Sequence, residues 1–279
     1  MQIIYQKDLP TDHGYYRSMS WLYKKYLHKC WLKTCDLSNQ AFWWIKDLWL
    51  FQISKFERVD KEPDLNEIKK NWFKHGLLIW IPYSRTEIPK WWRRLLLNTH
   101  FTTTWFSKIE DEFYYKKWSE RAKRARKKFL QNQDLRIEIV SNEVFSKYYK
   151  ETKAKQPMKC SFVKYHKDLS KLDENNDLRN MLCFDKDNKV LAWLSVINYN
   201  WNSSAHLVSF LTNAWKNVQA WTWLIDAWFK TSLENWIKYI NFDHLRDRYM
   251  SIDQKWYTEF KQNFMDFKVV FEKSYFKIF

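Results

Sequence analysis

The segment 116–128 carries the densest cluster of chemistry-bearing side chains. Eight of its thirteen residues are Lys or Arg, and its one acid is Glu120. Such a field attracts phosphate groups, and an aromatic ring within it offers a surface for base stacking. The pattern predicts a site for tRNA or a sugar diphosphate, although a solvated basic helix face would look the same. The side chains expected to bind are Lys116, Lys117, Trp118, Arg121 and Arg124.

A second candidate is the run Ala220-Trp221-Thr222-Trp223-Leu224, which Gln219 precedes. With glycine at 221 and 223 it would read A-G-T-G-L at the start of a helix. Glycines there allow backbone N–H groups to face an anion at the helix N-terminus. As printed, two indoles would fill that space. Close helix packing that needs small residues is the alternative interpretation.

The third candidate is the end of a predicted strand, where Asp243 and His244 follow Phe242. Polar groups at strand ends often serve active sites, and either side chain could orient an amine or act as a base. An Asp that caps the next turn is the alternative. The seven His show no H-x-x-x-H pair, and the four Cys form no CxxC, so the sequence predicts no metal site.

The composition contains an anomaly, because the 279 residues include 19 Trp and only 2 Gly. Ordinary proteins contain about 7% Gly, and Trp is not among their common residues. Several Trp stand where chain chemistry favours Gly. Trp201 lies in a turn-like run between two strand patterns, and Trp236 follows a helical pattern at a position where a left-handed residue is usual.

We therefore hypothesise that UGA codons are printed as Trp although the lineage reads them as Gly. A protein that is truly rich in Trp, with aromatic carbohydrate platforms, is the alternative. Trp80 and Trp118 read as genuine Trp. The positions that we assign to glycine are Trp193, Trp201, Trp215, Trp221, Trp223, Trp228, Trp236 and Trp256.

Charge and hydropathy restrict the class of protein. The formal charge is +16 and 46% of the residues are hydrophobic, which excludes a disordered tail and favours an anionic partner. The sequence contains no run of about 18 apolar residues, so it predicts no membrane-spanning helix. Its first residues do not resemble a secretory signal. Four scattered Cys suit a reducing compartment. We expect a cytoplasmic protein.

Periodicity predicts a mixed α/β (α+β) chain with a largely antiparallel sheet flanked by helices. The best boundary is the polar run 131–134, which gives domains 1–133 and 134–279. Expected strands are 49–60, 76–81, 136–140, 181–184, 190–199, 206–211, 237–242 and 267–279. Expected helices are 107–131, capped by Ser107, one that opens at Ser141, and 214–235.

With glycine restored, the C-terminal segments resemble the GNAT-like acyltransferase superfamily, and within it the Fem-type peptidoglycan bridge aminoacyltransferases. The first likeness is carried by the strand 190–196, the helix 223–230 and residues 235–243, which look like the family's G-x-x-x-x-D-F strand. The ending K-G-x-x-x-F-K-x-x-F matches residues 255–264. Ile79–Pro82 with the basic segment resembles a first subdomain, so residues 1–133 would be a partial GNAT-like unit.

The resemblance implies an amine that attacks an activated acyl carbon, with no covalent nucleophile. Lys261 matches the family's F-K lysine and is implied to stabilise the oxyanion; Asp243, from the strand end, is the second catalytic candidate. Arg246 and Lys255 are further candidates for stabilising the same negative charge. Gln219, Trp221 and Trp223 would form the acyl-donor loop. No permanent cofactor is implied; aminoacyl-tRNA or acyl-CoA would be the co-substrate.

One departure bears on the donor. Coenzyme A-binding members carry Gln or Arg three residues before the first loop glycine, and this chain has Val218 there, with Gln219 one residue late. We therefore expect an aminoacyl- or N-acyltransferase acting on the amine of a cell-envelope (peptidoglycan) precursor, with peripheral contact to the inner membrane face. A coenzyme A-dependent N-acetyltransferase and a non-catalytic nucleic-acid-binding protein are the alternatives.

Overall fold

A computed structural model describes most of the chain and divides it into two compact units. The described residues are 2–5, 22, 25–26, 33–37, 41–48, 51–59, 62–63, 76–82, 87–95, 103–132, 134–151, 157–199, 201–212, 214–244 and 258–278. Unit 1 comprises residues 1–2 and 105–268, and unit 2 comprises 3–104 and 269–279. No helix among these described residues is long and apolar enough to cross a bilayer.

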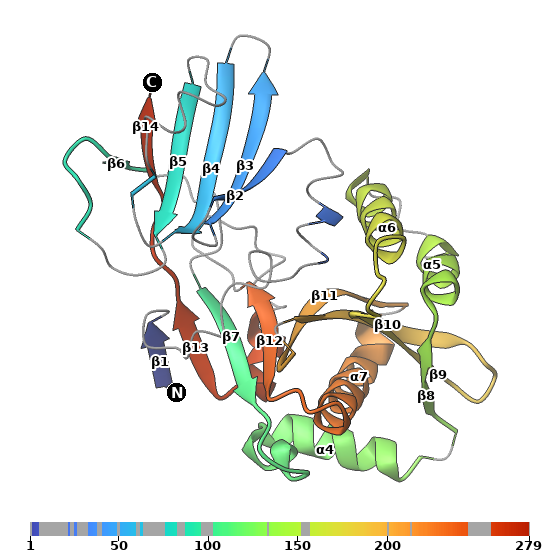
Figure 1. Ribbon diagram of the computed structural model, residues 1–279. Helices are drawn as coiled ribbons and strands as arrows, with labels where there is room; N and C mark the ends of the chain where they lie inside the picture. Colours follow the sequence, from blue (N-terminus) through green and yellow to red (C-terminus); the bar gives the residue numbers. More distant parts are fainter. Residues whose placement is uncertain are drawn as a thin grey trace. The chain divides into compact units, whose positions relative to one another are not determined.

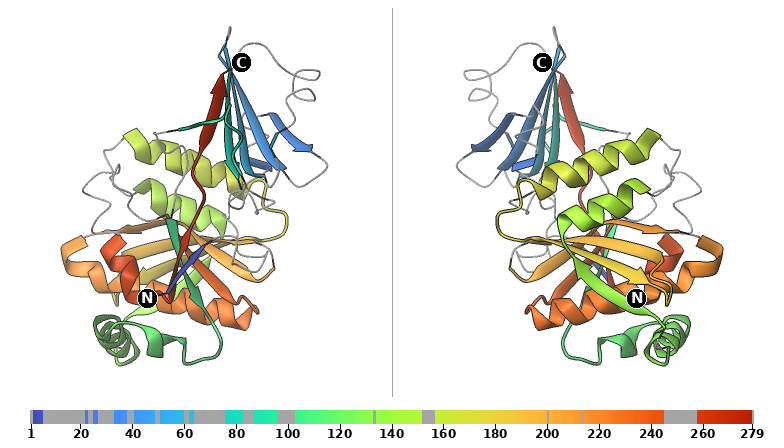
Figure 2. Two further views of the ribbon diagram at one scale, coloured as in Figure 1. Left: turned by 90° about the vertical axis from the view of Figure 1, so that its left-hand side faces the viewer. Right: turned by 90° about the vertical axis from the view of Figure 1, so that its right-hand side faces the viewer.

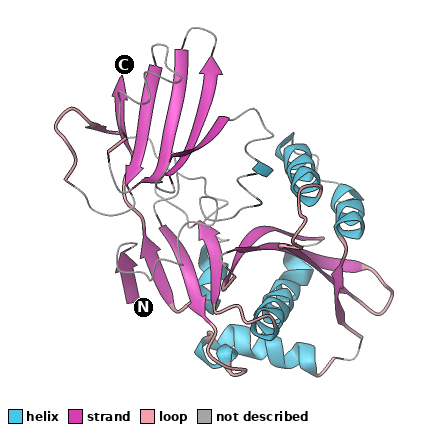
Figure 3. Cartoon of the chain, viewed as in Figure 1, coloured by secondary structure: helices cyan, strands magenta, loops and turns pink. Residues whose placement is uncertain are grey.

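Most of an eight-stranded sheet lies in unit 1 (Figures 1 and 3), in the order β1-β13-β7-β12-β11-β10-β9-β8; residues 3–5, 103–104 and 269–270 of its strands are assigned to unit 2. Neighbours from β8 to β11 pair antiparallel, whereas β11 and β12 pair parallel. The strands are β1 (Gln2–Tyr5), β7 (Thr103–Lys108), β8 (Arg136–Val140), β9 (Leu178–Phe184), β10 (Val190–Tyr199), β11 (Ser203–Leu211), β12 (Tyr239–His244) and β13 (Phe267–Val270). The predicted hairpin and the strand at 136–140 are confirmed.

Helices cover both faces of this sheet (Figure 2). Helices α5 (Asn142–Glu151) and α6 (Pro157–Ser170) lie on one face, and α4 (Glu120–Leu130) and α7 (Ala214–Glu234) lie on the other. Strands β9 and β10 are buried along almost their whole length because both of their faces are covered. The mixed α+β prediction is confirmed, although the sequence analysis did not identify α6.

Unit 2 contains a six-stranded sheet in the order β2-β3-β4-β5-β14-β6. Its strands are β2 (Lys33–Leu37), β3 (Ala41–Leu48), β4 (Phe51–Val59), β5 (Gly76–Pro82), β6 (Arg93–Arg94) and β14 (Tyr275–Ile278). Strands β4 and β5 pair parallel, and the other pairs given by the register are antiparallel. The predicted strands at 49–60 and 76–81 are confirmed.

The predicted helix over 107–131 is wrong in its first half. Ser107 lies in β7, and its hydroxyl donates to the backbone oxygen of Phe264 at 2.5 Å. The 3₁₀ helix η2 (Tyr114–Lys117) follows, and α4 begins after Ser119, whose hydroxyl accepts from the Ala122 N–H at 3.3 Å. Helix α4 belongs to unit 1, and the two compact units meet at 2/3, 104/105 and 268/269.

Two of the suspect Trp residues have left-handed backbone. The φ angle is 49° at Trp201 and 61° at Trp236. Residue 236 closes α7 in a Schellman motif, in which its N–H donates to the Leu233 oxygen at 3.1 Å and the Ile237 N–H to the Ser232 oxygen at 2.9 Å. Their indoles are 76% and 84% exposed, so packing does little to offset the strain. The backbone conformation at residues 201 and 236 is therefore the one that favours glycine.

Replacing either residue by glycine is therefore expected to stabilise the protein. Left-handed backbone costs a residue with a Cβ about 1–2 kcal/mol, and the extra freedom of glycine in the unfolded chain returns part of it. For Trp201→Gly and for Trp236→Gly we expect a net gain of about 1 kcal/mol in urea unfolding. Trp91, 58% exposed and without positive φ, is the control. A gain for Trp91→Gly, or a loss at 201 and 236, would contradict the explanation.

Candidate functional site

Strands β11 and β12 share only a short parallel ladder, and they part beyond it. Residues 203–205 pair with 239–241, whereas β11 continues to Leu211 and β12 to His244. On its other edge β11 carries a bulge, because Ser195 pairs with Val208 while Val196 pairs with His206. Leu207 is the extra residue. A bulge withdraws backbone groups from the ladder, so polar backbone becomes available next to the divergence.

A small cavity of about 10 Å³ lies at this divergence. His206 and Ser209 of β11 line it together with Phe242 of β12, and Lys261 closes it from the C-terminal segment. His206 Nε2 lies 3.0 Å from Ser209 Oγ. The cavity thus brings a cation, an imidazole and a hydroxyl to the place where the two strands separate.

Lys261 is buried, with 2% of its surface exposed. Its ammonium donates to the backbone oxygen of Phe242 in β12. Burial lowers the pKa of Lys261 to about 7, while the negative charge of Asp243 opposes that shift. A lysine of this kind is partly charged near neutral pH and can switch protonation state during a reaction.

Asp243 lies beside Lys261 at the end of β12, so the structure brings the two expected catalytic residues together. Its side chain is 5% exposed, and its backbone is left-handed with φ 62°. The Asp243 N–H donates to Asn241 Oδ1 at 2.8 Å, and Asn241 Nδ2 donates to the Tyr199 hydroxyl at 3.1 Å. Asp tolerates this conformation better than most residues, and such strain is common at functional sites.

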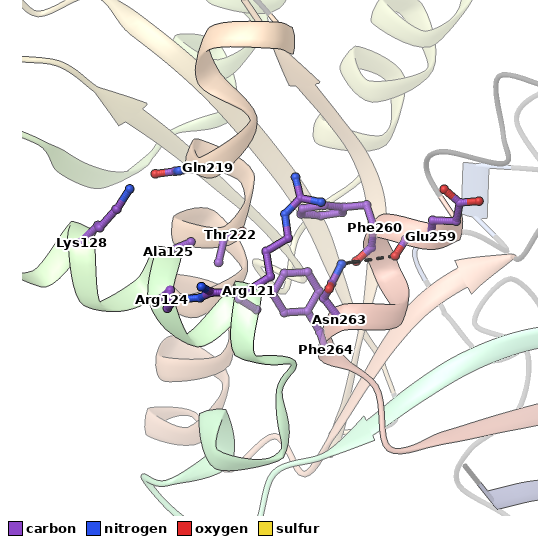
Figure 4. A pocket seen from close by; sticks show the side chains of 11 residues that line it. Arg121, Arg124, Ala125, Lys128, Gln219, Thr222, Glu259, Phe260, Asn263 and Phe264 are labelled. Atoms are coloured by element: carbon purple, nitrogen blue, oxygen red, sulfur yellow. Dashed lines mark hydrogen bonds between the residues drawn. The ribbon is translucent and has the colours of Figure 1, made fainter.

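A larger basic cavity of about 330 Å³ opens between α4, α7 and the segment 258–264. Arg121, Arg124 and Lys128 project from α4, and Gln219 and Thr222 come from α7 (Figure 4). The remaining wall consists of Ala122, Ala125, Glu259, Phe260, Asn263 and Phe264. Three cations against one carboxylate give this cavity a net positive charge, which suits a phosphate-bearing ligand.

A partly buried polar cluster holds α4 against α7. Arg126 Nε lies 2.7 Å from Asp226 Oδ1, and the Tyr114 hydroxyl donates to the same oxygen at 3.0 Å. The Arg126 guanidinium also stacks 3.9 Å from the ring centroid of Tyr115. Burial raises the pKa of Tyr114, so its hydroxyl stays a donor. The cluster fixes the helix that carries the cavity's cations.

We expect Asp226→Ala to destabilise unit 1 by about 3 kcal/mol, because it leaves the Arg126 charge without its carboxylate partner and leaves the Tyr114 hydroxyl only the backbone oxygen of residue 226, at 3.2 Å. Chemical denaturation measures the change. Glu138→Ala is the matched control, since the Arg136–Glu138 pair is equally short at 2.6 Å but about half exposed. It should cost less than about 1 kcal/mol. Equal effects of the two substitutions would show that the cluster has no special role.

The structure brings only some residues of the predicted basic site together. Arg121 and Arg124 line the basic cavity, but Lys116 and Lys117 lie in η2 outside it. Lys117 Nζ lies 3.0 Å from Glu110 Oε2, and Lys116 Nζ lies 3.9 Å from the Phe113 ring centroid. Trp118 as a stacking surface is wrong: it is 3% exposed and packs against Tyr114, Phe229 and Phe264.

The expected donor loop lies inside a helix. Helix α7 begins at Ala214, so residues 221 and 223 lie well beyond its first turn and their N–H groups are not at a helix N-terminus. Trp favours a helix more than Gly does, which explains why residues 221 and 223 lie within helix α7. Trp223 Nε1 donates to the Ala125 oxygen at 2.9 Å. Arg246, Lys255 and the side chain of His244 lie outside the described residues.

The sequence analysis did not single out His206, Ser209, Asn263 or Glu259. No spacing in the sequence reveals the first two, because the bulge at Leu207 shifts their register. Asn263 joins the cap of α4 to the C-terminal segment, because its Oδ1 accepts from the Ser119 hydroxyl at 2.7 Å, a contact between residues far apart in the sequence.

Comparison with known proteins gives a structural likeness only. No protein-family model matches the sequence, and no curated protein matches it. A crystal structure of FemX superposes with a TM-score of 0.70 at 9% identity, over 94% of this chain and 92% of that chain. The fold is GNAT-like.

Two further solved structures agree with this fold. The C-terminal domain of a protein assigned as a lysylphosphatidylglycerol synthetase from Agrobacterium fabrum gives a TM-score of 0.56 at 10% identity, over 94% of this chain and 88% of that chain. L-PGS from Bacillus licheniformis gives 0.51 at 7% identity, over 85% of this chain and 80% of that chain. The GNAT-like architecture expected from the sequence is confirmed.

Proposed function

We propose that this chain is an acyltransferase of the Fem type, which moves an aminoacyl group from aminoacyl-tRNA to an amine of a cell-envelope precursor. The observation that supports it most is the buried Lys261 at the divergence of β11 and β12, next to a cavity lined by cations. The likeness to FemX and to a lysylphosphatidylglycerol synthetase domain supports the same reaction class.

The chemistry needs few protein groups. The lone pair of the acceptor amine attacks the ester carbonyl carbon, a C–N bond forms, and the carbonyl oxygen takes the negative charge. The Lys261 ammonium lies at the cavity and would stabilise that oxyanion, with backbone of the bulge as a second source of N–H groups. When the C–O bond to the ribose breaks, the leaving oxygen gains a proton and the amine loses one.

Arg121, Arg124 and Lys128 would hold phosphates of the donor. In this role the basic cavity supplies binding energy at a distance from the reacting carbon, which positions the ester at Lys261. The donor's cytoplasmic origin fits the expected location. A contact with the inner membrane face would follow from a lipid-linked acceptor and is part of the proposal.

A donor comparison tests this function. The purified chain is incubated with a lysine-containing precursor peptide and either labelled aminoacyl-tRNA or labelled acetyl-CoA, and amide product is measured. We expect product from aminoacyl-tRNA. Product from acetyl-CoA alone would replace the proposal by a coenzyme A-dependent N-acetyltransferase. Tight, salt-sensitive tRNA binding with no product from either donor would indicate a nucleic-acid-binding protein.

Divided by the fraction of acceptor present as free amine, kcat/KM should fall as pH rises through about 7, because the working form of Lys261 is the ammonium and its pKa is about 7. Asp243→Asn removes the charge that raises this pKa, so the fall should move to lower pH. A pH–rate profile of kcat/KM for both proteins, corrected in this way, measures the shift. A corrected kcat/KM that rises through pH 7 would assign Lys261 the role of a base.

A further inference from the structure

Two aromatic side chains separate the basic cavity from the small cavity at Lys261. Phe260 lines both cavities. Trp221 lines the small cavity, and its ring centroid lies 5.2 Å from that of Phe260 at an interplanar angle of 50°. Trp221 is itself buried, with 9% of its surface exposed. Phe260 thus lies between the two cavities, with the Trp221 indole packed against it on the side of the small cavity.

Helix α7 contributes neighbouring residues to the two sides of this wall. Gln219 and Thr222 line the basic cavity, whereas Trp221, Leu224 and Ile225 line the small one. Successive helical residues point about 100° apart, so residues 221 and 222 face different cavities. A donor with its phosphates at Arg121 and Arg124 must therefore pass residue 221 to bring its acyl carbon to Lys261.

The space at Lys261 is too small for an acyl group while the indole is present. A cavity of about 10 Å³ holds about one water-sized sphere. An aminoacyl group has several non-hydrogen atoms and needs far more room. The larger cavity, at about 330 Å³, has room for part of a nucleotide but does not include Lys261 in its lining.

We propose that residue 221 is the gate of the acyl pocket. An indole there keeps the two cavities apart, and a small side chain joins them into one donor site that runs from Arg121 to Lys261. The size of residue 221 then sets the size of the acyl group that reaches Lys261. This inference rests on the proposed function, and glycine at 221, as the composition predicts for the cell, gives the open form.

The test compares Trp221→Gly and Trp221→Ala with the protein that has Trp at 221. Indole is the probe, because it has the shape of the deleted side chain. We expect crystals of Trp221→Gly to show one continuous cavity with indole bound beside Phe260, and indole to raise the melting temperature of that variant. Turnover of the active donor should rise about tenfold or more, with Trp221→Ala in between.

Trp193→Gly is the matched control. Trp193 is also buried, at 2% exposed, but it packs with Phe145 and Tyr149 against the opposite helices. Its loss should leave turnover at the level of the printed chain. The gate is overturned if both 221 variants keep two separate cavities and bind no indole. A joined cavity without turnover of aminoacyl-tRNA or acetyl-CoA would support the gate and remove the proposed function, so the two failures are distinguishable.

Discussion

Lys261→Met is expected to lower kcat for acyl transfer by about 10²- to 10³-fold, the usual loss when one oxyanion donor is removed. Met keeps the length and apolar character of the lysine stem but removes the charge. Lys261 is the cation that lines the cavity at the strand divergence, and its ammonium is held on the Phe242 oxygen. Because the interaction forms mainly in the transition state, the KM for the donor should change little.

Lys189→Met is the control for this prediction. Lys189 is exposed in the turn between β9 and β10, so it loses the same charge far from the cavity. Circular dichroism and thermal unfolding must show that both variants are folded. Full activity of folded Lys261→Met would exclude the assigned role, and equal losses in both variants would show that the effect is not specific to the site.

Neutralising the basic cavity should weaken donor binding and flatten its dependence on salt. In the triple variant Arg121→Gln, Arg124→Gln and Lys128→Gln, three phosphate contacts are lost. The slope of log K against log salt should fall in magnitude by about 2 to 3, since each contact releases close to one counterion. At low salt the loss of affinity should be roughly 10²-fold. Filter binding or fluorescence anisotropy with aminoacyl-tRNA measures both quantities.

A second triple variant controls for net charge. Lys147, Lys164 and Lys167 are exposed on α5 and α6, on the other face of the sheet, and their replacement by Gln removes the same three charges. Its salt slope should stay close to that of the unchanged chain. If both triple variants lose the same slope, the field of the whole protein binds the donor and the basic cavity has no special part in it.

The regular elements near the site follow from sequence patterns. The hairpin of β9 and β10 shows two apolar runs around a polar turn, and the turn at Asn188 has the left-handed backbone that Asn tolerates. The end of α7 and the start of β12 follow from periodicity. Asp243 and Lys261 are predicted separately, one from a strand end and one from the resemblance, and the structure places Asp243 near enough to raise the pKa of Lys261.

Other features depend on contacts that the sequence does not display. The acids 110–112 suggest the first turn of a helix, yet Glu110 serves as the partner of Lys108 and Lys117. Trp118 lies among charges in the sequence but packs inward, since aromatic partners reach it from α7 and from the 3₁₀ helix η3 (Gln262–Phe264). The bulge at Leu207 and the short ladder of β11 and β12 arise only in the assembled sheet.

The structure adds a physical argument to the composition anomaly. Composition alone allows a protein that is truly rich in Trp. Residues 201 and 236 have left-handed backbone, which glycine adopts readily and Trp does not, and their exposed indoles make few contacts that could offset the strain. Residue 221 adds a functional reason under the proposed gate, because its indole lines the small cavity that Lys261 also lines. Peptide mass spectrometry of the native protein over 199–238 reads all three positions, and glycine is the expected result.

The most direct test of the account is a crystal structure with a tetrahedral phosphonate that joins an aminoacyl-adenosine fragment to the acceptor amine. The chain with glycine at 221 is used, so that the pocket is open. We predict that a phosphonate oxygen lies about 2.7–3.1 Å from Lys261 Nζ, between β11 and β12, with the adenosine end toward Arg121. Binding of the phosphonate at any other place, with Lys261 left on the Phe242 oxygen and the divergence empty, would contradict it.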